Sequence, residues 1–279
     1  MKTFLKKCPL LIGILITIIG TAGIYFLPLM SDENPYISGI ARIIWAVIIT
    51  LGVRYLLLVK HHKPEKGSFG VGFKMFLPMF IFLVILSAAT VASAFIKGTA
   101  SIDSTFWVNL VGTAVSCIGI GFVEEIIFRV ALPDGIIKQF PDGKHTLVIT
   151  MIVSGLIFGF VHVVTSLDVE MTATNIAQII GKTLESGIFG VYMVMIYWRT
   201  KNIYTCVFAH AANDFLLFIG TLLTAGEGAS SYVASDQSEG IAAVGIYAFL
   251  FVVQLIIVLV KKTQMTKEVM DGVRDWMKE

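Results

Sequence analysis

Two adjacent carboxylates and an arginine lie at the end of a long apolar stretch of this sequence. The stretch begins near Phe106, and residues 121–129 read GFVEEIIFR. An ionised side chain at the centre of a membrane costs about 2.5–3.5 kcal/mol on insertion scales, so each should have a partner or a function. In a helix, Glu125 and Arg129 lie four residues apart on one face and can form an ion pair. Glu124 points about 100° away from that pair, so we expect it to find its partner on another helix.

Two later apolar stretches carry motifs at helical spacing, a phenylalanine and a histidine in the segment FGFVH and three polar side chains in the segment HAAND. The residues concerned are Phe158, His162, His210, Asn213 and Asp214. Within each segment they are three or four positions apart, which places them on one face of a helix. A histidine in a membrane helix is often only a packing residue, but three such motifs on three helices indicate a site.

The spacing along the chain predicts how these motifs meet. The turn Pro141-Asp142-Gly143 separates the first two stretches, which should form a helical hairpin. Glu124 lies 19 residues before Gly143 and His162 lies 19 residues after it, so the two reach equal depth in an antiparallel hairpin. His210 joins them if the hairpin projects into the cytoplasm. The site is then expected near the cytoplasmic face.

A buried carboxylate, two imidazoles and an Asn-Asp pair are groups that can perform hydrolysis. Glu124 could take a proton from water with help from a histidine, while the second histidine and an amide could stabilise an oxyanion. The same side chains suit a metal site as well. Glu124, His162 and His210, with a water molecule, could hold a catalytic zinc ion.

The composition is that of a membrane protein. Hydrophobic residues make up 56% of the 279 residues, charged residues 14%, and the mean hydropathy is +0.85. Cys8, Cys117 and Cys206 are scattered without the spacing of a metal site. No phosphate-binding loop or nucleic-acid-binding signature is present, so the expected partners are the lipid bilayer and a membrane-bound or lipidated peptide, and not nucleic acid.

The apolar runs predict an all-α, polytopic bundle of about eight transmembrane helices. They cover about residues 9–30, 36–59, 72–95, 106–140, 145–164, 176–198, 203–223 and 241–260. The fourth run should bend at Pro133, and Lys182 can pair with Glu185 in the sixth. Residues 265–277 have the pattern of an interfacial amphipathic helix. We divide the chain into residues 1–105, a core of residues 106–224, and residues 225–279.

The basic residues predict the orientation. With eight crossings and a cytoplasmic N-terminus, most of the 21 Lys and Arg residues lie at the cytoplasmic side, including those of the basic stretch 60–66. Only Arg42, Lys97 and Lys182 lie nearer the other face, whose loops hold several acidic residues. This distribution follows the positive-inside rule, so we expect a multi-pass protein of the cell membrane with both termini in the cytoplasm.

The three motifs resemble those of a known family. Residues 124–129 match EExxxR, residues 158–162 match FxxxH, and residues 210–214 match HxxxN/D. They occur in this order in the CPBP family, which comprises CAAX prenyl protease 2 (Rce1-like) and bacteriocin-processing intramembrane proteases. The resemblance covers about residues 106–218.

This resemblance implies a role for each matched residue. Glu124 resembles the glutamate that activates water, and His162 the residue that assists it. His210 and Asp214 resemble the residues that stabilise the tetrahedral intermediate. The last position is often Asn in the family, and an ionised Asp cannot donate to an oxyanion, so Asp214 would orient His210, be protonated, or leave donation to Asn213. A mechanism that needs no metal is the preferred reading, and a zinc-dependent one is the alternative.

Three classes of function remain open. The preferred one is an intramembrane endopeptidase that cuts a membrane-associated or lipidated peptide near the cytoplasmic face. The alternative is a non-catalytic immunity or regulatory protein that binds a sensor kinase or a bacteriocin target, although a pure binder has no need of costly intramembrane carboxylates. The third is a transporter or proton relay, which the lack of inverted repeats disfavours.

Overall fold

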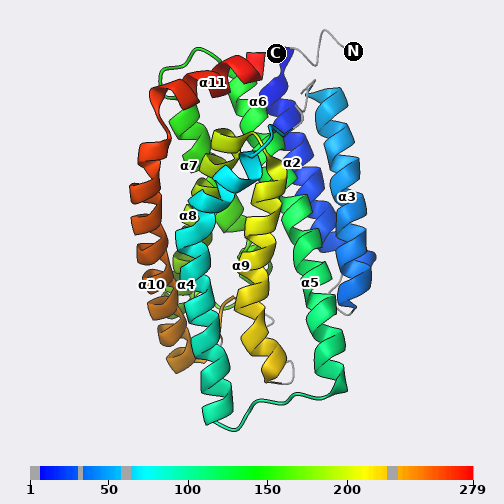
Figure 1. The fold of residues 1–279 in the computed structure, drawn as a ribbon, viewed down its shortest axis with the longest axis vertical. Coiled ribbons are helices and arrows are strands. Elements are labelled where there is room, and N and C mark those ends of the chain that lie inside the picture. Colours follow the sequence, from blue (N-terminus) through cyan, green and yellow to red (C-terminus); the bar gives the residue numbers. More distant parts are fainter. Residues whose placement is uncertain (1–6, 31–33, 58–63, 225–231, 235, 279) are drawn as a thin grey trace. The chain divides into compact units, whose positions relative to one another are not determined.

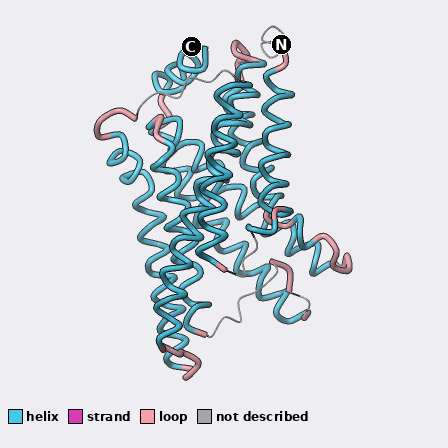
Figure 2. The backbone as a smooth tube through the Cα atoms, turned by 90° about the vertical axis from the view of Figure 1, so that its right-hand side faces the viewer, coloured by secondary structure: helices cyan, strands magenta, loops and turns pink. Residues whose placement is uncertain are grey.

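The computed structural model describes residues 7–30, 34–57, 64–224, 232–234 and 236–278. These residues form helices joined by short connections, with no strand among them (Figure 2). The helical membrane bundle predicted from the sequence is confirmed. Parts of the predicted basic stretch 60–66 and of the connection between the last two predicted runs fall outside the described residues.

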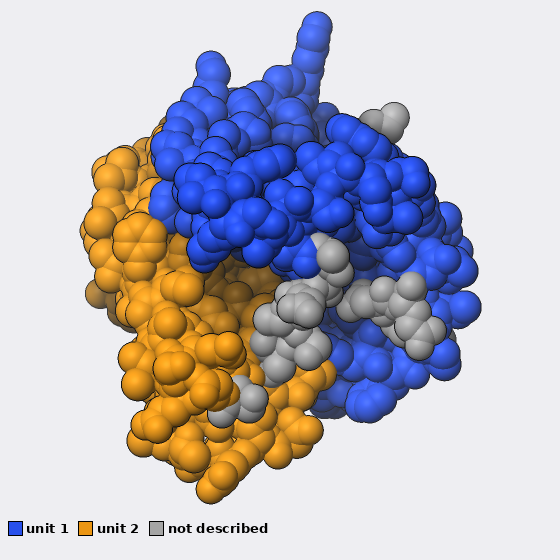
Figure 3. All heavy atoms as spheres, turned by 90° about the horizontal axis from the view of Figure 1, so that it is seen from below, with its two compact units in different colours: residues 1–135, 200–228 blue, residues 136–199, 229–279 orange. Residues whose placement is uncertain are grey.

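The chain divides into two compact units, drawn in blue and orange in Figure 3. Unit 1 comprises residues 1–135 and 200–228, and unit 2 comprises residues 136–199 and 229–279. The predicted core, residues 106–224, therefore contributes to both units. A hydropathy pattern locates the spans but carries no information on how distant spans group together.

Unit 1 is built from five long helices. Its elements are α2 (Pro9–Phe26), η1 (Pro28–Met30), α3 (Pro35–Leu56), α4 (Ser68–Ile96), α5 (Ser104–Glu125), η2 (Ile126–Ala131) and α9 (Ile203–Leu223). Helix α5 packs against α3 on one side and α9 on another, α9 also contacts α4, and α2 contacts α3 and η2 (Figure 1). Helices α5 and α9 thus lie in the middle of the unit.

Unit 2 contains the remaining helices. They are α7 (Thr146–Val161), η3 (Val164–Ser166), α8 (Ala173–Thr200), α10 (Gln237–Lys261), η4 (Lys262–Gln264) and α11 (Lys267–Lys278), while α6 (Leu132–Gln139) joins the two units. Glycines allow α7 and α8 to pack closely, because a Cβ atom at Gly155 would lie 2.6 Å from the carbonyl oxygen of Gly187. On α10, Ile246, Phe249 and Ile256 are exposed whereas Gln254 is buried, as expected for a helix that faces lipid on one side.

Seven helices among the described residues are long and apolar enough to cross a membrane, and the protein is a multi-pass membrane protein. The fifth predicted run, residues 145–164, corresponds to α7, which has only 16 residues. At 1.5 Å per residue it is about 24 Å long, shorter than the roughly 30 Å hydrocarbon core. The sequence pattern overestimated its length because the apolar run continues beyond Val161 into a turn.

The fourth predicted run is continuous over residues 104–139 and changes its helical geometry before Pro133. Residues 126–131 form a π-helical turn, in which the N–H group of Leu132 donates to the carbonyl oxygen of Ile127. Proline has no N–H group for an intrahelical hydrogen bond, so a wider turn at this position is the local response. π-Helical turns inside α-helices are frequent at functional sites.

Polar residues cap several of these helices. Asn34, Asp103, Asn202 and Asp236 each accept hydrogen bonds from backbone N–H groups in the first turn of the helix that follows. The hydroxyl of Thr105 and these backbone groups hold the pKa of Asp103 below its usual value. The caps fix where α3, α5, α9 and α10 begin.

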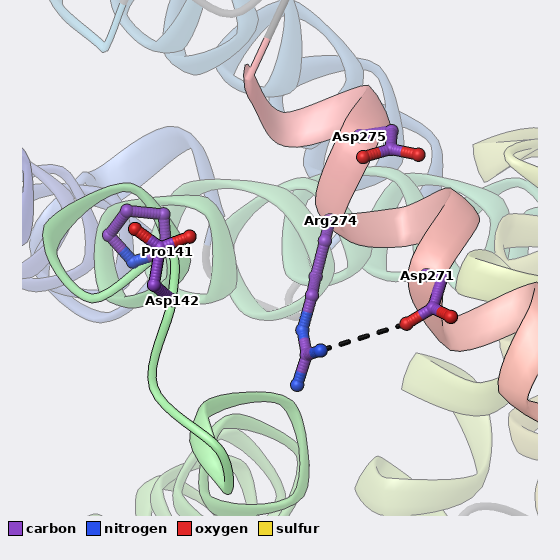
Figure 4. A pocket seen from close by; sticks show the side chains of 5 residues that line it. All are labelled: Pro141, Asp142, Asp271, Arg274 and Asp275. Carbon is purple, nitrogen blue, oxygen red and sulfur yellow. Dashed lines mark ion pairs between the residues drawn. The ribbon is translucent and has the colours of Figure 1, made fainter.

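The predicted helix at the C-terminus is present as α11, and two residues of its apolar face are buried. Val273 and Trp276 are buried in unit 2, and the ring of Trp276 meets the ring of Tyr197 at 5.4 Å between centroids. Arg274 forms an ion pair with Asp271 at 3.6 Å. Figure 4 shows these two side chains beside a surface pocket that is also lined by Pro141, Asp142 and Asp275.

Candidate active site

The candidate site lies between α5 and α9 in unit 1 (Figure 1). The two helices approach closely at Gly121, where a Cβ atom would lie 2.9 Å from the carbonyl oxygen of Val207 and 3.5 Å from Cβ of His210. Any larger residue would separate the helices at this level. Glu124 and Glu125 follow one turn later on α5, so the glycine brings both within reach of His210.

Glu125 and Arg129 form the ion pair that their spacing predicted. The Nε and Nη2 atoms of Arg129 donate to the two carboxylate oxygens of Glu125, at 2.8 and 2.9 Å. Both side chains are fully buried. Bidentate arginine–carboxylate geometry adds directional strength, so the pair holds the carboxylate of Glu125 in one orientation.

Glu125 also contacts His210, which the sequence did not predict. The Nδ1 atom of His210 lies 2.7 Å from Oε1 of Glu125. An ionised carboxylate can only accept hydrogen bonds. The Nδ1 atom therefore carries a proton and donates a hydrogen bond to Oε1 of Glu125. Arg129 thus orients Glu125, and Glu125 in turn orients His210.

The other nitrogen of His210 faces two further carboxylates. Its Nε2 atom is 3.7 Å from Oε2 of Glu124 and 3.4 Å from Oδ2 of Asp214. Asp214 is itself held by the side-chain amide of Asn213, which donates to Oδ1 at 3.1 Å. His210 is almost fully buried, whereas Glu124 and Asp214 are 15% and 17% exposed. The edge of the site that these two acids form is therefore its more accessible side.

Unit 1 supplies one charged residue that sequence reasoning did not assign to the site. Arg42 on α3 is buried and donates to Ser116 on α5 at 2.9 Å and to the backbone of Met30 at 2.9 Å. Arg42 therefore brings a buried positive charge against α5, the helix that carries Glu124. A single arginine inside an apolar run could have indicated a role in the site. The sequence analysis used Arg42 only to predict the orientation of its span.

Phe158 and His162 lie at the end of α7, in unit 2. Nδ1 of His162 is 2.8 Å from the carbonyl oxygen of Phe158, and their rings meet at 4.5 Å between centroids. Because a carbonyl oxygen only accepts, Nδ1 of His162 carries a proton and Nε2 is the nitrogen with the lone pair in the neutral ring. That His162 meets Glu124 and His210 stays a prediction.

A metal site would require several ligands around one point. Within the described residues, no group of three or more His, Cys, Asp or Glu side chains has an arrangement that could hold a metal ion. The predicted alternative set, Glu124, His162 and His210, combines side chains of the two units. The choice between a metal-dependent and a metal-independent mechanism therefore stays a prediction.

Comparison with known proteins agrees with the motif resemblance. Residues 105–216 match the model of the family described as type II CAAX prenyl endopeptidase Rce1-like. No curated protein and no solved structure matches the chain. The matched segment contains all three motifs, from EExxxR to HxxxN/D, and ends just after Asp214. Residues 105–216 are therefore similar to an Rce1-like domain, in agreement with the resemblance of the three motifs to the CPBP family.

Proposed function

We propose that this protein is an intramembrane endopeptidase that hydrolyses a peptide bond in a membrane-associated or lipidated peptide near the cytoplasmic face. The observation that carries the proposal is the placement of Glu124 and Asp214 against the same nitrogen of a buried histidine. The Rce1-like domain supports the same class of activity. Burying four charged side chains close together inside a membrane has a high free-energy cost, and a catalytic role would explain why they are present. These side chains are Glu124, Glu125, Arg129 and Asp214.

In the proposed reaction Glu124 is the general base. It takes one proton from a water molecule, and the resulting hydroxide attacks the peptide carbonyl. The carbonyl π electrons move onto oxygen, and the N–H groups of the site stabilise the oxyanion. Collapse of the tetrahedral intermediate breaks the C–N bond, and Glu124 returns its proton to the leaving amine. No cofactor is needed in this scheme.

The roles of the two histidines follow from their partners. His210 donates from Nδ1 to Glu125, so Nε2 is its only nitrogen available to the reaction. A proton on Nε2 would be stabilised by Asp214 and could be offered to the oxyanion. Asp214 then acts by orienting His210, one of the options that the sequence left open. His162, with its lone pair on Nε2, would assist in positioning the water.

The substitution Glu124→Gln tests the proposal. It removes the base but keeps the shape, so cleavage of a reporter peptide that the wild type cuts should be abolished. The detergent-solubilised variant should be at least as heat-stable, because a desolvated carboxylate is a burden on folding, and it should still bind the peptide. Glu268→Gln, in an exposed position of α11, is the matched control and should cleave normally.

Chelators separate the two mechanisms. A metal-dependent enzyme should lose activity after treatment with a chelator such as 1,10-phenanthroline and regain it with zinc or cobalt. The proposed mechanism predicts full activity throughout. Cleavage that persists in Glu124→Gln would reject Glu124 as the base, whichever way the chelator experiment ends.

A further inference from the structure

Helix α8 carries a row of polar side chains that the proposed reaction does not use. Asn175, Gln178, Lys182 and Glu185 are spaced three, four and three residues apart, which places them on one face of the helix. Polar groups inside a membrane helix are costly and usually functional. The sequence predicted only the pairing of Lys182 with Glu185 within this row.

The lysine of this row is fixed in place. Nζ of Lys182 lies 2.8 Å from Oε2 of Glu185. The carboxylate of Glu185 also accepts hydrogen bonds from Gln254 on α10 at 2.8 Å and from Ser186 at 3.1 Å. Because the carboxylate has several donors, its orientation is set, and the ammonium group of Lys182 is held with it.

The ammonium group of Lys182 lies over an aromatic ring that also contacts His162. The distance from Nζ to the ring centroid of Tyr232 is 4.6 Å, within the range of cation–π attraction. The same ring is 6.1 Å from the imidazole of His162. Tyr232 therefore bridges the fixed cation and the histidine of the FxxxH motif.

The backbone around Tyr232 is anchored by the same row of residues. The side chain of Gln178 accepts a hydrogen bond from the N–H group of Ala234 at 2.8 Å and donates one to the carbonyl oxygen of Ala234 at 3.1 Å. The hydroxyl of Tyr247 donates to the carbonyl oxygen of Tyr232 at 2.8 Å. The Tyr232 ring is thus positioned by its own backbone as well as by Lys182.

We propose that Lys182 and Tyr232 are positioning residues for His162. The carbonyl oxygen of Phe158 fixes the tautomer of the imidazole through Nδ1, and the ring of Tyr232 limits the rotation of the imidazole by its contact with it. In this role neither Lys182 nor Tyr232 needs to contact the substrate. The inference rests on the proposed function only in so far as His162 takes part in the reaction, since all these contacts lie within unit 2.

The substitution Tyr232→Ala tests this role through two measurements. The first is the rate at which diethyl pyrocarbonate modifies His162, followed by mass spectrometry. This rate can be measured whether or not the protein itself cleaves a peptide. With the ring removed, this rate should rise about threefold or more, as expected for a side chain that is freed to sample other rotamers. The second is peptide cleavage, where kcat should fall about tenfold with little change in KM, as for a displaced catalytic group.

Two controls separate positioning from general loosening. Tyr232→Phe keeps the ring and should behave like the wild type in both measurements. Phe160→Ala removes an aromatic ring that is 47% exposed on α7, only two residues from His162, and should change neither. A fall in kcat that Tyr232→Phe does not rescue would overturn the role of the ring.

The cation is tested by a double substitution. Lys182→Met alone would leave Glu185 as a buried charge without its cation and would destabilise the protein. Lys182→Met with Glu185→Gln avoids that charge and retains an acceptor for Gln254. We expect near-normal thermal stability with faster modification of His162. Unchanged modification in this variant and in Tyr232→Ala would overturn the proposal; if the wild type proves to cut no peptide, the modification rates still decide it.

Discussion

His210 is the residue on which the acidic side chains of unit 1 converge. Its Nδ1 atom is held by Glu125 and its Nε2 atom faces Glu124 and Asp214. One nitrogen therefore fixes the ring, and the other is the nitrogen that is available to the proposed reaction. This arrangement gives adjacent glutamates different roles: Glu125 orients the histidine, while Glu124 stands at the accessible edge of the site.

The ion pair of Glu125 and Arg129 should be needed for folding. Arg129→Ala leaves a buried carboxylate without its cation, which typically costs about 3–5 kcal/mol, so the melting temperature in detergent should fall sharply. The double variant Glu125→Gln with Arg129→Gln removes both charges and should recover part of that loss, since glutamine can still accept from Nδ1 of His210. A single variant as heat-stable as the wild type would refute this role.

Asp214 should act as an acceptor for His210 and not through its charge alone. Asp214→Asn keeps an acceptor oxygen, so we expect kcat for a cleaved reporter peptide to remain within about tenfold of the wild type. Asp214→Ala removes the acceptor and should lower kcat by up to about 10²–10³, the loss that follows when an oxyanion donor itself is removed. If Asn is as damaging as Ala, the negative charge itself is required.

At the scale of the element, the end of α5 shows where periodicity stops predicting structure. The i,i+4 rule predicted the pair of Glu125 and Arg129, and Pro133 predicted a disturbance of the helix. Neither predicted the π-helical turn over residues 126–131. The extra residue of a π-helical turn rotates the side chains that follow by about 100° relative to a regular α-helix. A regular helical repeat therefore predicts the wrong face for the side chains of α6.

The close approach of α5 and α9 should be sensitive to one methyl group. Gly121→Ala places a Cβ atom against backbone of α9 and should cost about 1–3 kcal/mol by overpacking, with loss of peptide cleavage as His210 moves from the glutamates. Gly52→Ala on α3 is the control, because no atom lies within 4 Å of its Cβ position. That control should raise stability by about 0.5–1 kcal/mol. Equal effects of both variants would argue against close packing at Gly121.

At the scale of the whole molecule, hydropathy predicted the helices, and the motifs marked residues of α5 and α9 that the structure brings together. They did not predict Arg42, the contact of Glu125 with His210, or the link from Lys182 through Tyr232 to His162. All three depend on contacts between segments distant in the sequence, which leave no periodic signal. The length of α7 was overestimated for another reason, since its apolar pattern continues past the end of the helix.

The basic residues at the two ends of unit 1 predict its orientation in the membrane. Helices α2, α4 and α9 start at the end of this unit where α3 stops (Figure 1). The basic residues at or near that end are Lys7, Arg54, Lys66, Lys74 and Lys201, whereas the opposite end, between α4 and α5, has Lys97 and Asp103. The positive-inside rule places the first end in the cytoplasm, and with it the N-terminus.

Cysteine labelling tests this orientation. In a background with Cys8, Cys117 and Cys206 replaced by serine or alanine, Ser101→Cys should react with a membrane-impermeant maleimide added to intact cells. Lys66→Cys should react only after the cells are opened. Asp168→Cys, between the short helix α7 and α8, should behave like Ser101→Cys if the chain crosses the membrane at α7 despite its length. The reverse pattern at residues 66 and 101 would move the N-terminus outside and the candidate site away from the cytoplasmic face.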